Sequence, residues 1–542
     1  MSAETPAADI DCDVAVVGAG PAGSVLANLL GEAGVSVAVL EARKTIIAHP
    51  RAVGIDDEAI RTLQSFGLAQ VVLDNSLQSM PIRYHDSAGR VLAHVAPSAR
   101  PYGWPRRNLF YQPFLEEQLH EHLTTYAGVR LRTGAEVVGL TQDAGGATLR
   151  VQADSGEFSV RAKYVVGADG GRSFVREALG IEMLGDTAPV KWLVVDVEKD
   201  TWNAPYSAVY TSPVRPCMTI PLPFGYRRFE FQIREQENPD TVNEMDNVRR
   251  LLKRFYPDSP VPPVVRNDVY WHHSRTAASF GVGRVFLVGD AAHLQPPFFG
   301  QGMNSGFRDV TNLAWKLAAV VAGRAAPRTL ASYDTERRHN AAVMVKFATQ
   351  MGRMYKARTA LTERVRNRLF RGVQKVPGAR DYILQMKYKP VPRYTEGLVV
   401  GATGVDGKSL VGRAFPQPTV RTAADEPARL DDVLGTRIAV VGLVPDAAAA
   451  VSTRTAERLR AQGGVVVQSK PARVYERERS SATDRPAEQI EVFDVDGGLR
   501  DLLLARPADE VYVVRPDRYV AAACRAADLD RVLGAFLAQL ES

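Results

Sequence analysis

The chain has 542 residues, of which 45% are hydrophobic and 24% charged, proportions typical of a globular protein with a large core. Its 67 basic and 61 acidic residues leave a net charge of +6 dispersed along the chain, which argues against nucleic acid as a partner. No apolar run approaches the roughly 18 residues of a membrane span, and Met1–Asp11 lacks the apolar core of a signal peptide. Three widely spaced cysteines suit reduced thiols, so we expect a cytoplasmic protein without a membrane partner.

The first predicted element is a βαβ unit over Asp13–Glu41, in which an apolar strand enters a glycine turn and a helix follows. The G-x-G-x-x-G glycines are Gly18, Gly20 and Gly23. In this arrangement the first glycine makes a tight turn, the second lets backbone approach a pyrophosphate, and the third lets the helix pack on the strand. Glu41 ends the second strand, where its carboxylate can accept hydrogen bonds from ribose hydroxyls, so FAD or NAD fits better than NADP.

The middle of the chain predicts further helices and a second sheet. Helices are expected at Asp57–Leu73 and Pro113–Tyr126, and Val165–Ser173 (VVGADGGRS) carries Asp169 in a second glycine-rich turn. Apolar and polar residues alternate between residues 186 and 280, in Lys191–Val197, Met218–Leu222 and Arg228–Ile233. This alternation predicts a sheet that forms one wall of a substrate cavity.

A third glycine-rich segment follows the predicted strand Val285–Val288. The end of this strand would aim the carboxylate of Asp290 at the ribityl or ribose hydroxyls of a flavin. After a Pro-Pro loop, Gly300 and Gly302 open a helix expected from about residue 303 to 321. Its electropositive start would stabilise the negative charge of a reduced flavin. For this segment taken by itself, the alternative is a capped helix after a Pro-Gly loop. The three segments together predict FAD.

The C-terminal part predicts a separate α/β module after a linker rich in proline and glycine at residues 390–407. Its expected elements are a strand at Arg437–Val444, a helix at Ala447–Gln462, strands at Val465–Val467 and Glu510–Val514, and a closing helix from Asp528. The chain has no C-x-x-C, so this module cannot exchange thiols, and we assign it to stability or to subunit contact in a possible homodimer.

The motifs resemble those of single-component flavoprotein aromatic hydroxylases of the p-hydroxybenzoate hydroxylase type. The resemblance rests on Gly18–Gly23, on Asp169-Gly170 with Arg172 and Ser173, and on Gly289-Asp290 with the loop Pro296–Asn304. Within that group the chain is most similar to the 3-(3-hydroxyphenyl)propionate hydroxylases, over nearly its whole length. The stretches that carry this closer similarity are Pro50–Glu58, Gly103–Asn108, Pro213–Pro216, Arg228–Phe231 and Arg515–Arg518.

The resemblance implies an α/β fold with a Rossmann-like FAD-binding domain, an inserted mixed β-sheet substrate domain and a thioredoxin-like C-terminal domain. The expected boundaries are residues 1–185 and 283–400 for FAD binding, 186–282 for the substrate domain and 408–542 for the C-terminal domain. Because no second G-x-G-x-x-G with a following helix occurs, NADH or NADPH is expected to visit transiently.

The resemblance also implies roles for cofactor-binding residues. Arg51 would lie beside the FAD and the incoming nicotinamide, and Gln112 would contact the flavin from the start of a helix. Asp169 would serve both cofactors, and Pro297 would present its carbonyl near the reactive edge of the flavin. Gly302 and Met303 would donate backbone N–H groups to its pyrimidine end, with Asn304 directly after them. We expect no metal ion at this site.

The reaction implied by the family begins when NAD(P)H reduces FAD, and oxygen is then transferred through a flavin C4a-hydroperoxide to a phenolic ring, ortho to its hydroxyl. The expected substrate is 3-(3-hydroxyphenyl)propionate or 3-hydroxycinnamate. His273 or its neighbour His272 is the candidate to remove the phenolic proton, and Arg215 is the candidate partner for the substrate carboxylate. Two alternatives stay open: a tailoring monooxygenase for a larger polycyclic or antibiotic substrate, and a flavin-dependent quinone or lipid reductase.

Overall fold

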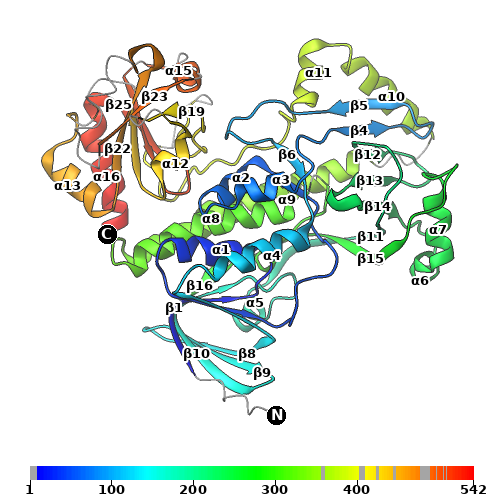
Figure 1. Ribbon diagram of the computed structural model, residues 1–542, viewed down its shortest axis with the longest axis horizontal. Helices are drawn as coiled ribbons and strands as arrows, with labels where there is room; N and C mark the ends of the chain where they lie inside the picture. The colour runs from blue at the N-terminus through cyan, green and yellow to red at the C-terminus, as the bar shows by residue number, and fades with distance from the viewer. Residues whose placement is uncertain are drawn as a thin grey trace.

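The computed structural model contains three large sheets, each with helices packed against it (Figure 1). It describes residues 9–542 except 299, 356–359, 402–408, 423–425, 443–446, 448, 476–488, 496, 504–505 and 508. In Figure 1 the C-terminal sheet lies at one side of the molecule and the second sheet at the other, with the long helices α8 (Gly302–Val321) and α9 (Ser332–Tyr355) crossing between them. Every helix in the described residues is too short or too polar to span a bilayer.

The first sheet has the strand order β16-β17-β10-β1-β2-β7, extended by the hairpin β8-β9. Strands β17, β10, β1, β2 and β7 run parallel, and their apolar side chains are buried because α1 (Pro21–Glu32) and α8 cover this part of the molecule. The strands are β1 (Ile10–Val17), β2 (Val37–Glu41), β7 (Val129–Thr133), β8 (Ala135–Gln142), β9 (Ala147–Ala153), β10 (Gly156–Gly167), β16 (Gly281–Val282) and β17 (Val285–Leu287).

The parallel register of this sheet brings three distant sequence segments together. Val17 pairs with Gly167, and Gly167 pairs with Leu287, so β1, β10 and β17 end side by side. The glycine turn at residue 18, the Asp169 turn and the Gly289-Asp290 turn directly follow these three strand ends. Ligands of open α/β sheets bind at the carboxyl ends of the strands, so this edge is where the first sheet positions a cofactor.

The second sheet has the order β18-β15-β11-β14-β13-β12-β4-β5. Its strands are β4 (Ile82–His85), β5 (Val91–Val95), β11 (Met183–Val197), β12 (Ser207–Tyr210), β13 (Cys217–Pro221), β14 (Arg227–Gln232), β15 (Val264–Ala277) and β18 (His293–Leu294). One face packs on α6 (Pro239–Asn243) and α7 (Met245–Lys253) through a core that includes Phe229 and Phe231. The opposite face is left for the cavity described below.

Two expected boundaries require correction. Strands β4 and β5 lie within the segment assigned to FAD binding, yet β4 pairs with β12 and therefore belongs to the second sheet. The helix expected over Asp57–Leu73 is two helices, α2 (Asp57–Gln64) and α3 (Ala69–Asp74), because Gly67 adopts φ +85° between them. The helical periodicity of the sequence continues across Gly67, so the sequence did not indicate this break. The pairing of β4 with the distant strand β12 leaves no local pattern in the sequence.

The remaining elements connect these sheets. They are the two-stranded sheet of β3 (Gly54–Asp56) and β6 (Arg107–Leu109), and the helices α4 (Gln112–Leu123), α5 (Phe174–Ala178), α10 (Ala360–Val373) and α11 (Pro377–Leu384). Helices α10 and α11 lie against β4 and β5, where Phe370 and Ile383 pack on the apolar side chains of those strands.

The C-terminal sheet has the order β20-β19-β23-β22-β21-β24-β25, with helices on both faces. Its elements are β19 (Thr419–Arg421), β20 (Pro427–Arg429), α12 (Leu430–Leu434), β21 (Ala439–Gly442), α13 (Thr453–Ala461), β22 (Val465–Pro471), β23 (Gln489–Asp494), α15 (Gly498–Leu503), β24 (Glu510–Val514), β25 (Val520–Arg525) and α16 (Leu529–Glu541). The expected helix from Ala447 begins only at Thr453, because the side chain of Ser452 accepts a hydrogen bond from Thr455 N and caps it. Parts of the linker and of the Arg437–Val444 strand lie outside the described residues.

A buried ion-pair network attaches the C-terminal domain to α9. Arg515 donates to both carboxylate oxygens of Glu336, at 2.7 and 2.8 Å, and Lys316 donates to the same carboxylate at 2.8 Å. All three side chains are fully buried. Burial alone would raise the pKa of Glu336, but the two cations hold it well below its usual value. Removal of one partner would therefore leave uncompensated buried charge.

We expect Glu336→Gln to lower the free energy of unfolding by about 3 kcal/mol, because Arg515 and Lys316 lose their shared carboxylate in the interior. Urea unfolding followed by circular dichroism measures this loss. The control is Asp246→Asn, which removes an exposed partner of Arg249 and should cost less than about 1 kcal/mol. Equal effects of the two substitutions would contradict the role assigned to the buried network.

Candidate functional site

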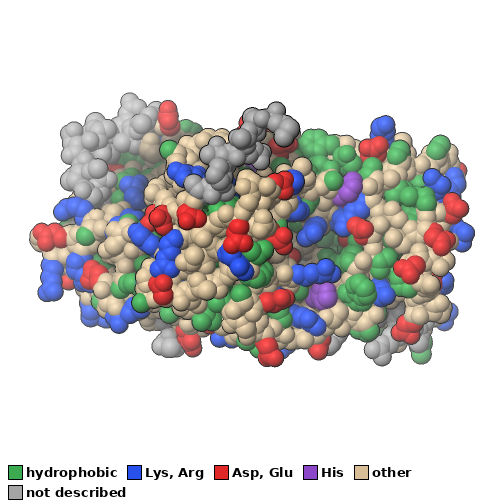
Figure 2. Space-filling view, turned by 90° about the horizontal axis from the view of Figure 1, so that it is seen from below, with side chains coloured by type: hydrophobic (Ala, Val, Ile, Leu, Met, Phe, Trp, Pro, Cys, Tyr) green, Lys and Arg blue, Asp and Glu red, His purple; other side chains and the backbone are tan. Residues whose placement is uncertain are grey.

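A cavity of about 860 Å³ extends from the carboxyl edge of the first sheet to the open face of the second sheet. It is lined by residues from all three glycine-rich segments, which the sequence predicted to act together. The predicted cofactor residues that line it are Gly18, Gly20, Glu41, Arg51, Gln112, Asp169, Asp290, Pro297, Gly302, Met303 and Asn304. On the face drawn in Figure 2, acidic and basic side chains are interspersed over the surface.

The first glycine turn is shaped by close backbone contacts. Gly18 has φ +99°, and a Cβ there would lie 2.5 Å from the carbonyl oxygen of Ala168. Gly23 lies outside the cavity lining, and its Cβ would lie 1.9 Å from the carbonyl oxygen of Gly18, as expected for a glycine that lets the helix pack on the strand. A Cβ on Gly20 would meet no atom within 4 Å, so this turn leaves open space at the start of α1.

Glu41 is held in place by three hydrogen bonds. Its carboxylate accepts from Ala19 N at 2.8 Å and from both the backbone N and Nε of Arg43 at 3.0 Å. Burial alone would raise the pKa of Glu41, but these donors lower it, so the group is ionised at neutral pH. An ionised carboxylate at this strand end can accept hydrogen bonds from ribose hydroxyls, as the sequence predicted.

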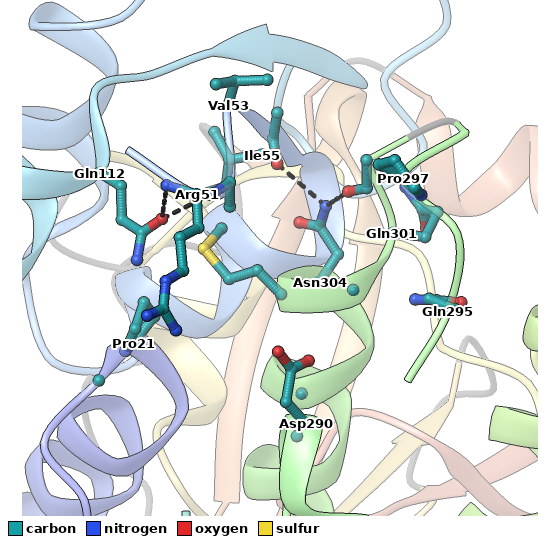
Figure 3. Close-up of a pocket in the computed structure, with 18 of the residues that line it drawn as sticks. Pro21, Arg51, Val53, Ile55, Gln112, Asp290, Gln295, Pro297, Gln301 and Asn304 are labelled. Carbon is teal, nitrogen blue, oxygen red and sulfur yellow. Dashed lines mark hydrogen bonds between the residues drawn. The ribbon is translucent and has the colours of Figure 1, made fainter. Parts of the chain in front are cut away.

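Gln112 positions the backbone that carries Arg51. Its Oε1 accepts from Arg51 N at 2.9 Å and Ala52 N at 2.7 Å, while its Nε2 donates to Glu116. In Figure 3 the side chain of Arg51 extends from this anchor toward Pro21 at the start of α1. The position of Arg51 beside the first glycine turn suits a contact with the cofactor.

The loop before α8 is fastened to β3 by Asn304. Its Oδ1 accepts from Asp56 N at 3.0 Å, and its Nδ2 donates to Gly54 O at 3.1 Å and Gly300 O at 2.6 Å (Figure 3). The Asn304 amide is thus occupied by backbone groups. The carbonyl of Pro297, predicted to face the flavin, accepts from Gly300 N at 2.8 Å, which leaves one lone pair of that oxygen for a ligand.

The residues of this half of the cavity fit an anionic dinucleotide. Among the described residues, the N-cap positions of α1 and α8, Gly20 and Gln301, provide no side-chain capping hydrogen bond. The N–H groups in the first turn of each helix, which begin at Ala22 in α1 because Pro21 has none, therefore remain available, and helix N-termini favour negative charge. In addition, Asp169 Oδ1 is buried and no described residue donates to it, so this oxygen can accept from a cofactor hydroxyl.

The second sheet contributes a face that combines polar and aromatic groups. Register places Trp192 opposite Tyr270, Val194 opposite Glu230, and Asp196 opposite Arg228. Tyr270 donates to Glu230 at 2.9 Å, and Arg228 donates to Asp196 at 2.8 Å through two nitrogens. Sequence reasoning missed Trp192, Glu230 and Tyr270, although the period-two alternation of Arg228–Phe231 was the signal that Arg228 and Glu230 share the face opposite Phe229.

The two histidines of β15 occupy different environments. His272 is buried, and its ring stacks on Trp192 at 5.2 Å and meets the edge of Phe298 at 5.0 Å. The Nδ1 atom of His273 lies 2.9 Å from Thr187 Oγ1. Burial, followed by the nearby Arg275, lowers the pKa of His273, so its imidazole is neutral at pH 7. Both histidines line the cavity.

Arg215 forms an ion pair outside the cavity. Its guanidinium pairs with Glu237 and donates to Gln232 O at 3.1 Å, and the residue is absent from the cavity lining that the described residues form. We therefore assign Arg215 a structural role instead of the expected contact with the substrate carboxylate. The sequence feature that suggested this role was an arginine between two prolines. It gave no information about Glu237, which lies 22 residues further along the chain.

Comparisons with known proteins agree with this geometry. A family model described as an FAD binding domain matches residues 11–348, and one described as the HcaD C-terminal domain matches residues 412–539. The 3-(3-hydroxy-phenyl)propionate/3-hydroxycinnamic acid hydroxylase 2 of Burkholderia vietnamiensis is 44% identical, over 97% of this chain and 96% of its own length. A hydroxylase of the same description from Mycobacterium sp. (strain JLS) is 40% identical, over 97% and 91%.

The fold comparison extends along the whole chain. The crystal structure of the flavin-dependent monooxygenase PieE in complex with FAD and substrate matches with a TM-score of 0.81 at 21% identity, covering 98% of this chain and 100% of that one. The cavity, the three glycine-rich segments and the family match define a flavoprotein with FAD as its cofactor. The chain belongs to the FAD-dependent aromatic hydroxylases.

We expect Gly20→Asp to abolish FAD binding without unfolding the protein. Aspartate is a good N-cap, and a Cβ at this position meets no atom within 4 Å, but its carboxylate would occupy the space for the cofactor phosphates. Repulsion between like charges should weaken FAD binding by about 100-fold or more. Flavin absorbance of the purified protein and titration of the apoprotein with FAD measure this loss.

The matched control is Gly378→Asp, at an exposed position in the first turn of α11 where a Cβ also has open space. It should retain FAD. Unchanged FAD affinity in Gly20→Asp would show that the start of α1 does not hold the pyrophosphate.

Proposed function

We propose that this enzyme hydroxylates 3-(3-hydroxyphenyl)propionate or 3-hydroxycinnamate ortho to the existing hydroxyl, with NADH or NADPH and O₂ as co-substrates. The support for this substrate is the 44% identity, over 97% of the chain, to a hydroxylase named for both acids. Relatives named as hydroxylases favour this reaction over the quinone or lipid reductase that the sequence left open. The structure of PieE is 21% identical to this chain, so that likeness concerns the fold alone and does not favour the alternative of a tailoring monooxygenase.

We expect the cofactor-binding residues to contact different parts of FAD along the cavity. When bound, FAD supplies the redox chemistry, accepting electrons from the nicotinamide and activating oxygen. The start of α1 would hold its pyrophosphate, Glu41 its adenosine ribose, and Asp290 its ribityl chain. Gly302 and Met303 would present backbone N–H groups at the start of α8, where negative charge is stabilised. Arg51 would add a positive charge beside the flavin.

The second sheet would supply the substrate wall. Trp192, His272 and Phe298 form an aromatic cluster that excludes water from the ring to be hydroxylated. The phenolic proton must leave as oxygen is transferred, and its usual pKa of about 10 is too high for spontaneous loss at neutral pH. His273 is the candidate acceptor because its imidazole is held neutral. Tyr270, on the same strand, donates to Glu230 on β14, which β11 separates from that strand.

Oxygen consumption with NADH and NADPH tests the proposal. The FAD-loaded enzyme should oxidise NAD(P)H slowly alone and at least about tenfold faster with 3-(3-hydroxyphenyl)propionate, because turnover depends on the correct substrate. NMR of the product should show vicinal hydroxyls. Stimulation by polycyclic phenols but not by either acid would favour a tailoring function. Anaerobic turnover with a quinone would refute monooxygenation.

A further inference from the structure

The cationic side chains along the second-sheet half of the cavity differ in whether a carboxylate neutralises them. Four of them are paired: Arg228 with Asp196 at 2.8 Å, Arg266 with Asp268 at 2.6 Å, Lys389 with Asp56 at 3.0 Å and Arg106 with Asp57 at 3.9 Å. A guanidinium taken out of water without a carboxylate is costly, and it is retained in proteins where it binds an anion. A cavity cation without a carboxylate partner is therefore a candidate to bind an anionic ligand.

Among the described residues, Arg107 is such a cation. Arg51 and Arg172 also line the cavity without an ion pair, but Arg51 extends toward Pro21 and Arg172 belongs to the Asp169 turn, both on the first-sheet side. Arg107 lines the cavity from β6, and within the described residues it forms no ion pair with a carboxylate. Two of its five N–H donors are used, one by Met80 O and one by Ser207 Oγ at 2.9 Å. Burial lowers the pKa of Arg107 to about 10, although Tyr84 and Tyr388 oppose this shift. The group stays charged at neutral pH, with three donors left for a ligand.

The surroundings of Arg107 are mixed in a way that matches one class of molecule. Ser207 lies on β12, and the adjacent cavity-lining side chains Ile82, Val209 and Met386 are apolar. Such a site accepts a short aliphatic chain along its apolar wall and a carboxylate at its end. Planar carboxylate groups match the guanidinium fork with two parallel hydrogen bonds.

We propose that Arg107, held by Ser207 and by the backbone of Met80, binds the carboxylate of the substrate side chain and makes the enzyme selective for phenolic acids over neutral phenols. This inference rests on the proposed function and adds to it the residue that determines specificity. The three-carbon chain of a phenylpropionate or a cinnamate would then set how far the ring lies from this anchor. Arg215, the earlier candidate, is replaced in this role because Glu237 neutralises it outside the cavity.

The test compares an acid with its neutral counterpart. Binding of 3-(3-hydroxyphenyl)propionate and of its primary amide is measured from the change in flavin absorbance on titration of the FAD-loaded enzyme. Arg107→Gln should weaken binding of the acid by about 10- to 100-fold, the range for a lost charge-assisted contact. Binding of the amide should change by less than about threefold, since it makes no ion pair. Arg107→Lys, which keeps the charge, should recover part of the preference for the acid.

Two further measurements make the outcome decisive. Arg215→Gln should leave the ratio of acid to amide affinity as in the unmodified enzyme, and Arg107→Gln should retain its FAD, because Arg107 belongs to the substrate side. An unchanged ratio in Arg107→Gln, or loss of FAD from it, would overturn the assignment. If the unmodified enzyme bound neither compound, the proposed function would be wrong. If it bound the acid equally well with and without Arg107, only the role of Arg107 would be wrong.

Discussion

Pairing of buried guanidinium groups with carboxylates holds the parts of this molecule in place. Arg228 pairs with Asp196 on the second sheet and also donates to Arg51 O at 2.7 Å, so the sheet fixes the chain segment beside the cofactor site. Burial alone would lower the pKa of Arg228, but Asp196 raises it. Because an unpaired buried charge costs several kcal/mol, an arrangement that separated one partner of such a pair from the other would be strongly disfavoured.

The same constraint links the C-terminal domain to the flavin site. Arg61 on α2 donates to Asp431 at 2.8 Å across the domain boundary, and Arg308 on α8 pairs with Asp56 and Glu58 at the junction of β3 and α2. Asn304 then joins β3 to the first turn of α8. The C-terminal domain therefore supports α8, whose N-terminus lines the cavity, without contributing a residue to the cavity lining in the described part of the chain.

Charge also distinguishes the two ends of the cavity. Near the first sheet, open helix N-termini provide partial positive charge, which favours an anionic ligand. In the second-sheet half of the cavity, four of the described cations are paired with carboxylates and Arg107 is not, so this guanidinium has a large effect on what can bind. Aromatic side chains lie between these regions, where a planar ring can pack and water is displaced.

The sequence alone determined the α/β fold class and the FAD requirement, and it predicted a set of cofactor residues of which most line the cavity, because glycine turns at strand ends are local features with a fixed spacing. It also predicted strand Glu510–Val514 with the bounds the structure has. Only the tertiary structure showed that β4 and β5 belong to the second sheet and that His272 and His273 have different surroundings. It also showed that Arg107, and not Arg215, lines the cavity in the described part of the chain. These outcomes depend on which carboxylate or strand lies opposite, and such partners are distant in the sequence and leave no periodic signal in it.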